Sequence, residues 1–175
     1  MSTKRKMLSD WQADYILDLM RLIETQSKQT LATWAIDYAK KHLLVIWTKY
    51  YPDDNRVKDA ILASKLWLRK EINLTQAKPL ILACHQAAKE KDDNPAAQAA
   101  ARAVAQSCST IHSARHCLGL ALYGALALAY DNLSDSAKWE DLEKYAAKEC
   151  IKMTQNLASV AIVDEPNPAK INWHC

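Results

Sequence analysis

Glycine and proline are scarce in this chain of 175 residues, which contains two Gly and five Pro. Sandwiches and barrels need many tight turns, which use these two residues, so their scarcity argues against an all-β fold. The two glycines, Gly119 and Gly124, lie in one apolar segment, so a Gly-rich loop that would cradle a phosphate group is excluded. In that segment we expect them to allow a close approach between helices. Phe is absent, so six Trp and seven Tyr supply the aromatic bulk.

Strong net charge and long apolar runs are also missing. The formal net charge is +3, and the short basic cluster at residues 4–6 is typical of a solvated chain end, so we expect no nucleic-acid partner. The longest uncharged run, residues 116–130, is shorter than the ~18 residues of a membrane span. The N-terminus has no apolar segment of the kind found in signal peptides. The sequence therefore predicts a soluble cytoplasmic protein without a membrane partner.

Five cysteines occur without CxxC spacing, at positions 84, 108, 117, 150 and 175. In a cytoplasmic protein we expect them to be reduced thiols.

The segment from Pro95 to Tyr130 contains only two charged residues, Arg102 and Arg115. A helix that is apolar nearly all round belongs in the middle of a bundle. As one straight helix the segment would be about 54 Å long at ~1.5 Å per residue, which exceeds the roughly 40 Å diameter expected of a compact domain of this size. A bend or break near residues 107–110 is therefore predicted, and the pattern leaves open whether the segment is one bent helix or two.

The other apolar residues recur at three- and four-residue steps, as amphipathic helices require. The predicted helices run from Ser9–Asp10 to about residue 26, over 30–50 with Thr30 as cap, over 55–71, from 73 or 75 to 91, and over 134–158. Pro79 is expected to make the start of the fourth helix irregular or delayed. The prediction is an all-α, single-domain bundle of about six to seven helices (helical core 8–158) around a central apolar helix pair. An irregular tail, residues 159–175, is expected to lie against the body through Ile171 and Trp173.

Three histidines are the main candidates for chemistry. His112 and His116 are four residues apart and would share a helix face, while His85 lies on another predicted helix. Such residues could bind zinc, but the spacing fixes no third or fourth ligand, and Ser113 stands where a HExxH hydrolase has Glu. We therefore favour packing roles, predict no catalytic residue, metal or cofactor, and expect Asp37 to be a hydrogen-bond partner of a buried histidine. Together these four residues are the candidates for a small polar pocket.

An ordered series of short motifs spans the middle of the chain. The motifs are LATWAIDYA (31–39), YPDDNR (51–56), Ala60-Ile61, WLRKEI (67–72), ACHQAA (83–88) and TIHSARH (110–116). The series, over about residues 31–130, resembles the immunity proteins of bacterial polymorphic-toxin systems, in the family described as like immunity protein five. The sequence departs from that pattern at Asn55 and Lys70, where Asp and Gly are expected.

The resemblance implies a helical cytoplasmic protein, not an enzyme, that binds and neutralises a cognate toxin. A neutralising surface needs a few aromatic or Arg anchors, and the candidates for contact with the partner are Tyr51, Asp53, Asp54, Arg56 and Arg69. The two aspartates could equally be helix caps. The alternative is a small-molecule or metal-binding helical protein, possibly an enzyme, with a pocket around His85, His112 and His116. The oligomeric state cannot be predicted from these patterns.

Overall fold

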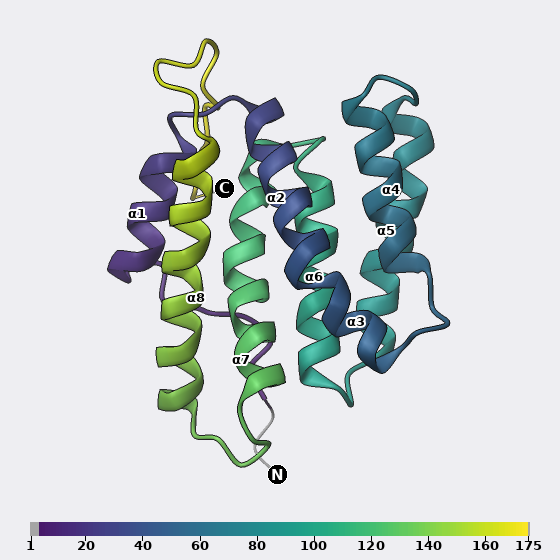
Figure 1. Ribbon diagram of the computed structural model, residues 1–175, viewed down its shortest axis with the longest axis vertical. Helices are drawn as coiled ribbons and strands as arrows, with labels where there is room; N and C mark the ends of the chain where they lie inside the picture. The colour runs from purple at the N-terminus through teal and green to yellow at the C-terminus, as the bar shows by residue number, and fades with distance from the viewer. Residues whose placement is uncertain (1–3, 175) are drawn as a thin grey trace.

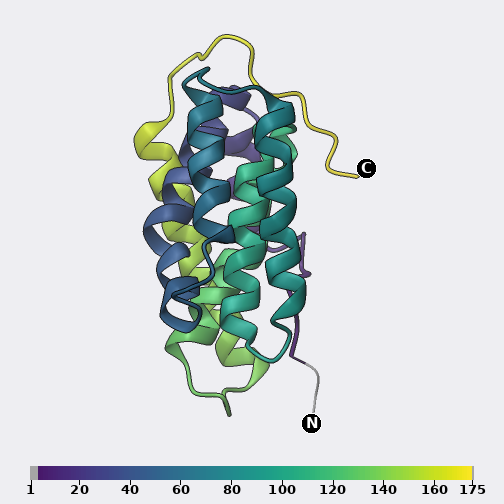
Figure 2. The same cartoon turned by 90° about the vertical axis from the view of Figure 1, so that its right-hand side faces the viewer.

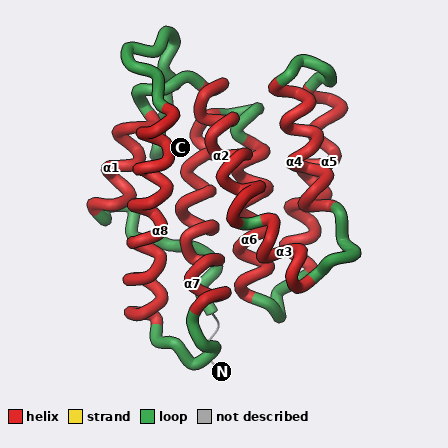
Figure 3. The backbone as a smooth tube through the Cα atoms, in the orientation of Figure 1, coloured by secondary structure: helices red, strands yellow, loops and turns green. Residues whose placement is uncertain are grey.

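The computed structural model describes residues 4–174, and over this range helix is the only regular secondary structure. The helices lie roughly along one long axis (Figure 1) and are joined by short loops (Figure 3). They are α1 (Asp14–Ile23), α2 (Lys28–His42), α3 (Leu44–Tyr50), α4 (Arg56–Leu68), α5 (Leu74–Glu90), α6 (Pro95–Ser109), the 3-10 segment η1 (Ala114–Cys117), the π-helical segment η2 (Leu120–Ala125), α7 (Leu126–Asn132) and α8 (Trp139–Val160). The all-α prediction is confirmed, and counting α2 and α3 as one kinked helix gives seven α-helices in the described range.

The apolar segment 95–130 forms the predicted central pair. α6 ends at Ser109, the chain turns through residues 110–117, and η2 and α7 return beside α6 (Figure 1). α6 also contacts α2, α3, α4 and α5, so it is surrounded on most sides, as Figure 2 shows from the α4–α5 side. Only Pro95, Arg102, Gln106 and Ser109 of this helix are not fully buried. The predicted break near residues 107–110 is confirmed, and the segment is two helical arms rather than one bent helix.

Both glycines lie where the returning arm meets a neighbour. A Cβ added at Gly119 would lie 2.6 Å from Cγ of Gln106 and even closer to Cβ of Gln106. A Cβ added at Gly124 would lie 2.9 Å from a terminal methyl group of Leu43. The close helix–helix approach expected from these residues is present at both positions.

Two helices near the N-terminus begin at residues other than those predicted. α1 begins at Asp14, because the side chain of Asp10 instead accepts a hydrogen bond from the backbone N–H of Gln12 (3.0 Å) in a turn. The cap of α2 is Ser27, whose hydroxyl accepts from the backbone N–H of Thr30 (3.2 Å), so the prediction of Thr30 as cap was wrong. The helix predicted over 30–50 is also interrupted, at Leu43, whose buried side chain faces Gly124.

Of two later helix starts, that of α5 agrees with one of its two predicted caps, Asn73, and that of α8 differs from the prediction. α5 begins directly after Asn73, because Asn73 and Gln76 exchange side-chain to backbone hydrogen bonds in a capping box (3.0 Å each). The predicted delay of this helix at Pro79 was therefore wrong. Pro79 lies inside α5 and only lacks the N–H that would donate to the carbonyl one turn earlier. α8 begins at Trp139 rather than near residue 134, because the preceding residues form a turn closed by the bond from Ala137 N to Ser134 O (2.9 Å).

The C-terminal tail lies against α1 and the start of α2, as predicted. The amide of buried Gln26 donates to the carbonyl of Ile162 (3.1 Å) and accepts from its N–H (2.8 Å). The indole of Trp173 donates to Glu24 (2.7 Å), and Ile171 packs against the core. The carboxylate of Glu165 accepts hydrogen bonds from the backbone and hydroxyl of Ser27 (2.7 Å each), which adds a negative charge at the N-terminus of α2. Over residues 4–174, no helix combines the length and apolarity that crossing a membrane requires.

We predict that Gly119→Ala destabilises the protein by about 1–3 kcal/mol, the usual cost of overpacking, because Cβ of Gln106 is fixed to the backbone and cannot move away without shifting α6. Gly124→Ala is the matched control, since a leucine methyl group can rotate away and the helix gains propensity. Chemical denaturation of both variants measures the free energy of unfolding. An unfolding free energy of Gly119→Ala equal to that of the wild type would contradict the packing described here.

Candidate functional site

The loop between α3 and α4, here called the 50–56 loop (Tyr50–Arg56), is held in place by contacts with Trp47 and Lys91. Trp47, which is buried, donates its indole N–H to the backbone carbonyl of Asp54 (2.9 Å). The ring of Tyr51 packs against Trp47 with 4.8 Å between centroids, and Nζ of Lys91 lies 4.6 Å from the centre of the Tyr51 ring. Burial raises the pKa of Tyr51, and nearby Asp93 raises it further. The loop thus presents an aromatic ring already fixed in position.

Arg56 ties the loop to the end of α5. Its guanidinium donates through Nε and Nη2 to the carboxylate of Asp54 (3.0 and 2.7 Å) and through Nη2 to Glu90 (2.8 Å). These bonds lower the pKa of both carboxyl groups. Asp54 also accepts the backbone N–H of Arg56 (3.2 Å), the first residue of α4, although the N-cap residue of this helix is Asn55.

Asp53 differs from Asp54 in its surroundings. It is exposed beside Pro52 and, within residues 4–174, makes neither an ion pair nor a side-chain hydrogen bond. Residues 50–56 line a shallow surface depression of about 530 Å³. Four of the five predicted contact residues, Tyr51, Asp53, Asp54 and Arg56, are therefore brought together on one surface.

Arg69, the fifth predicted contact residue, lies at the opposite end of α4 from Arg56. Its side chain is exposed and pairs with Glu71 (2.9 Å). The structure thus does not join Arg69 to the 50–56 loop surface.

The three histidines lie near the end of α6. Nε2 of His85 on α5 is 3.4 Å from Oγ of Ser109, and Nδ1 of His116 is 2.9 Å from Oε1 of Gln106. The expectation that Asp37 would be their partner was wrong, because residues of α6 take that place. His112 is exposed in the turn after α6.

Burial lowers the pKa of both His85 and His116, so both are neutral at pH 7. Repulsion between the two rings when both are protonated, with Lys89 and Arg102, lowers the pKa of His85 further, and Arg115 does so for His116. Over the described part of the chain, there is no group of three or more His, Cys, Asp or Glu residues arranged to hold a metal ion.

Four cysteines, at positions 84, 108, 117 and 150, are buried free thiols. Burial raises the pKa of each, to about 12 for Cys108 and Cys150, so they are protonated and unsuited to nucleophilic attack. Cys175 lies outside the described residues.

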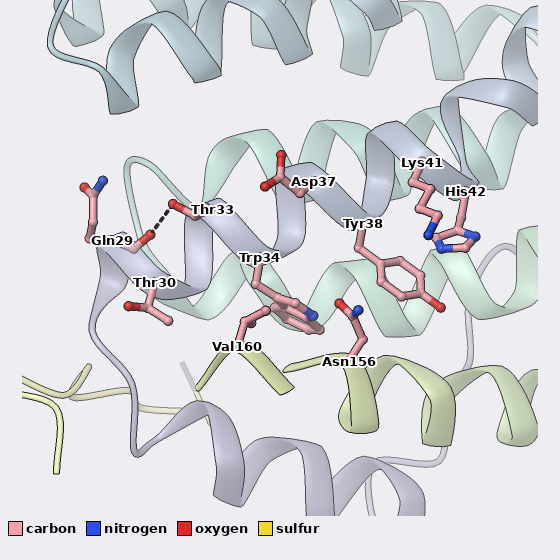
Figure 4. A pocket seen from close by; sticks show the side chains of 10 residues that line it. All are labelled: Gln29, Thr30, Thr33, Trp34, Asp37, Tyr38, Lys41, His42, Asn156 and Val160. Carbon is pink, nitrogen blue, oxygen red and sulfur yellow. Dashed lines mark hydrogen bonds between the residues drawn. The ribbon is translucent and has the colours of Figure 1, made fainter. Parts of the chain in front are cut away.

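A separate cavity of about 350 Å³ lies between α2 and α8 (Figure 4), here called the α2–α8 cavity. Its lining residues are Gln29, Thr30, Thr33, Trp34, Asp37, Tyr38, Lys41, His42, Asn156 and Val160. Asp37, one of the predicted polar-pocket residues, belongs to it, but its carboxylate binds Lys65 on α4 (2.5 Å) and points away from Trp34 and Asn156 in Figure 4. His85, His112 and His116 do not line this cavity.

Sequence reasoning missed most of this cavity. Trp34, Tyr38 and His42 are spaced by four residues, which does place them along one face of α2, and the rings of Tyr38 and His42 lie 4.3 Å apart. The opposite wall comes from Asn156 and Val160, more than a hundred residues later. No local pattern connects these two walls.

The comparison with protein families agrees with the motifs in the sequence. A family model described as "Imm-5 like putative immunity protein" matches residues 21–156. The chain belongs to this family. No curated protein and no solved structure shows a significant match.

The family match is wider than the motifs suggested. It begins within α1 and ends within α8, so it includes the 50–56 loop, the three histidines and Asn156 of the α2–α8 cavity. The tail, from residue 161, lies outside it.

Lys70, where the family pattern suggested Gly, ends α4 in a left-handed conformation with φ of 62°. Its N–H donates to the carbonyl of Trp67 (2.8 Å), and the N–H of Glu71 donates to that of Leu66 (2.9 Å). These two bonds define a Schellman motif, in which the left-handed position favours Gly. The departure from the pattern therefore carries a conformational cost without changing the way the helix ends.

We expect Lys70→Gly to stabilise the protein by roughly 0.5–1 kcal/mol, because the relief of left-handed strain exceeds the entropy that Gly adds to the unfolded chain. Lys58→Gly, at an exposed position inside α4, is the control and should destabilise by a similar amount. Thermal and denaturant unfolding measure both. A Lys70→Gly variant less stable than the wild type would show that α4 does not end as described.

Proposed function

We propose that this chain is an immunity protein that binds a cognate bacterial toxin and neutralises it without catalysing a reaction, in the cytoplasm of the producing cell. Family membership over residues 21–156 is the observation that carries this proposal. The buried, protonated cysteines and neutral, hydrogen-bonded histidines are consistent with a binding protein.

We propose the 50–56 loop surface as the site of toxin contact. Trp47 and Arg56 fix the loop before any partner arrives, which reduces the conformational entropy lost on binding. Tyr51 supplies an aromatic anchor of the type enriched at interface hot spots. Three exposed acids at this end of the molecule, Asp53, Asp92 and Asp93, make no ion pair within residues 4–174. The surface therefore favours a toxin that presents basic side chains to it.

Asp53→Lys is expected to lower the affinity for the toxin by tenfold or more while leaving the melting temperature unchanged, because the exposed side chain of Asp53 makes neither a hydrogen bond nor an ion pair within residues 4–174. Asp54→Ala should instead lower stability by about 0.5–2 kcal/mol, because Asp54 bonds Arg56 and the start of α4. The measurements are calorimetric titration with the cognate toxin, growth of cells that co-express the two proteins, and thermal unfolding.

Glu140→Lys, which makes the same charge change at an exposed position at the start of α8, is the matched control and should bind and protect as the wild type does. Arg69→Ala asks whether the contact extends to the far end of α4. If Asp53→Lys and Glu140→Lys both bound as tightly as the wild type, the toxin would dock elsewhere. If the wild type bound no toxin and gave no protection, the immunity function itself would fail.

A further inference from the structure

Trp34 carries a buried hydrogen-bond donor with no acceptor. Its side chain is 3% exposed, and its indole nitrogen has no hydrogen-bond partner among residues 4–174. The indole N–H of buried Trp47, by contrast, donates to a backbone carbonyl. Because most buried donors in folded proteins are paired, an unpaired one calls for a specific explanation.

The unpaired nitrogen belongs to a side chain that lines a cavity. Trp34 lines the α2–α8 cavity, and Figure 4 shows its nitrogen on the ring edge that faces Tyr38 and Asn156. The cavity volume of about 350 Å³ is at the lower end of the range typical of small-molecule sites. Less than 1 Å² of the indole nitrogen is accessible, so a ligand in this cavity reaches the N–H only when a side chain beside it, such as the exposed Asn156, moves aside.

The groups around the cavity are rich in donors. Asn156 offers an amide that makes no side-chain hydrogen bond within the described residues, and Lys41 makes no ion pair there. Tyr38 stays protonated, because burial raises its pKa to about 12. The three acids nearby already have partners: Asp37 pairs with Lys65, Glu149 pairs with Lys152, and Glu165 accepts hydrogen bonds from the hydroxyl groups of Ser27 and Thr30. The cavity therefore suits a ligand that accepts hydrogen bonds and carries negative charge.

The walls suit a flat apolar body. The rings of Trp34 and Tyr38 and the side chain of Val160 come from α2 and α8. Aromatic rings and aliphatic side chains of this kind pack well against another aromatic ring.

We propose that the α2–α8 cavity is a binding site for a small aromatic carboxylate. The carboxylate accepts hydrogen bonds from the indole N–H of Trp34 and the amide of Asn156, and the ligand ring packs against Tyr38 and Val160. This site is separate from the 50–56 loop and does not depend on the proposed toxin binding.

The test uses sodium benzoate as probe and neutral benzamide as its matched analogue. In protein labelled with ¹⁵N at tryptophan, the six indole N–H groups can be followed by NMR, and Trp34→Phe identifies the signal of Trp34. Benzoate should shift the Trp34 signal saturably, and benzamide should bind at least tenfold more weakly. Titration calorimetry should show that Trp34→Phe and Asn156→Ala each weaken benzoate binding by tenfold or more, and that Trp139→Phe, in another part of the molecule, does not.

Three results would overturn the proposal. A Trp34 signal that benzoate leaves unmoved would show that the ligand does not reach this donor. Equal affinity for benzoate and benzamide would exclude a carboxylate site. Unchanged affinity in Asn156→Ala, whose exposed side chain is not needed for folding, would place the ligand elsewhere. None of these results would affect protection from a toxin, so the two proposals fail independently.

Discussion

The burial of α6 is the constraint on which the other elements depend. This helix is made largely of small residues and carries one charged side chain, Arg102, so water is a poor environment for it. Its alanines allow α2, α3, α4, α5 and the returning arm to approach it closely. Two buried polar side chains on it donate to backbone carbonyls, Ser107 to Ala103 in the same helix (2.8 Å) and Gln98 to Ala88 of α5 (2.9 Å). The outer helices can therefore carry charged surface residues while their inner faces cover α6.

The sequence predicted the features that are determined by local pattern. The apolar segment 95–130, its break before Thr110 and the close approach at Gly119 all follow from composition and spacing over one or two helical turns. Features that depend on distant partners were not predictable in this way. The strength of the cap at Ser27 depends on Glu165, which arrives from the tail, and the cavity at Trp34 depends on Asn156. The partners of His85 and His116 likewise come from the packing of α5 and η1 against α6, not from their own helices.

The candidate surfaces differ in how they are prepared for binding. Internal hydrogen bonds and an ion pair fix the shape of the 50–56 loop before binding. A partner would therefore contact a preformed surface and its unpaired acids. The α2–α8 cavity instead retains an unpaired donor in a buried position, which a ligand would satisfy. The 50–56 loop joins α3 to α4, whereas the cavity lies between α2 and α8, so each can be altered without changing the other.

The central claim is that the 50–56 loop surface contacts a toxin, and hydrogen–deuterium exchange of the protein alone and in complex with that toxin tests it most directly. The account predicts slower exchange on binding for the amides of residues 50–56 and of the end of α5 at residues 90–93, with the exposed start of α8 unchanged. Protection confined to another surface, with exchange in the 50–56 loop the same in the free and bound protein, would contradict it.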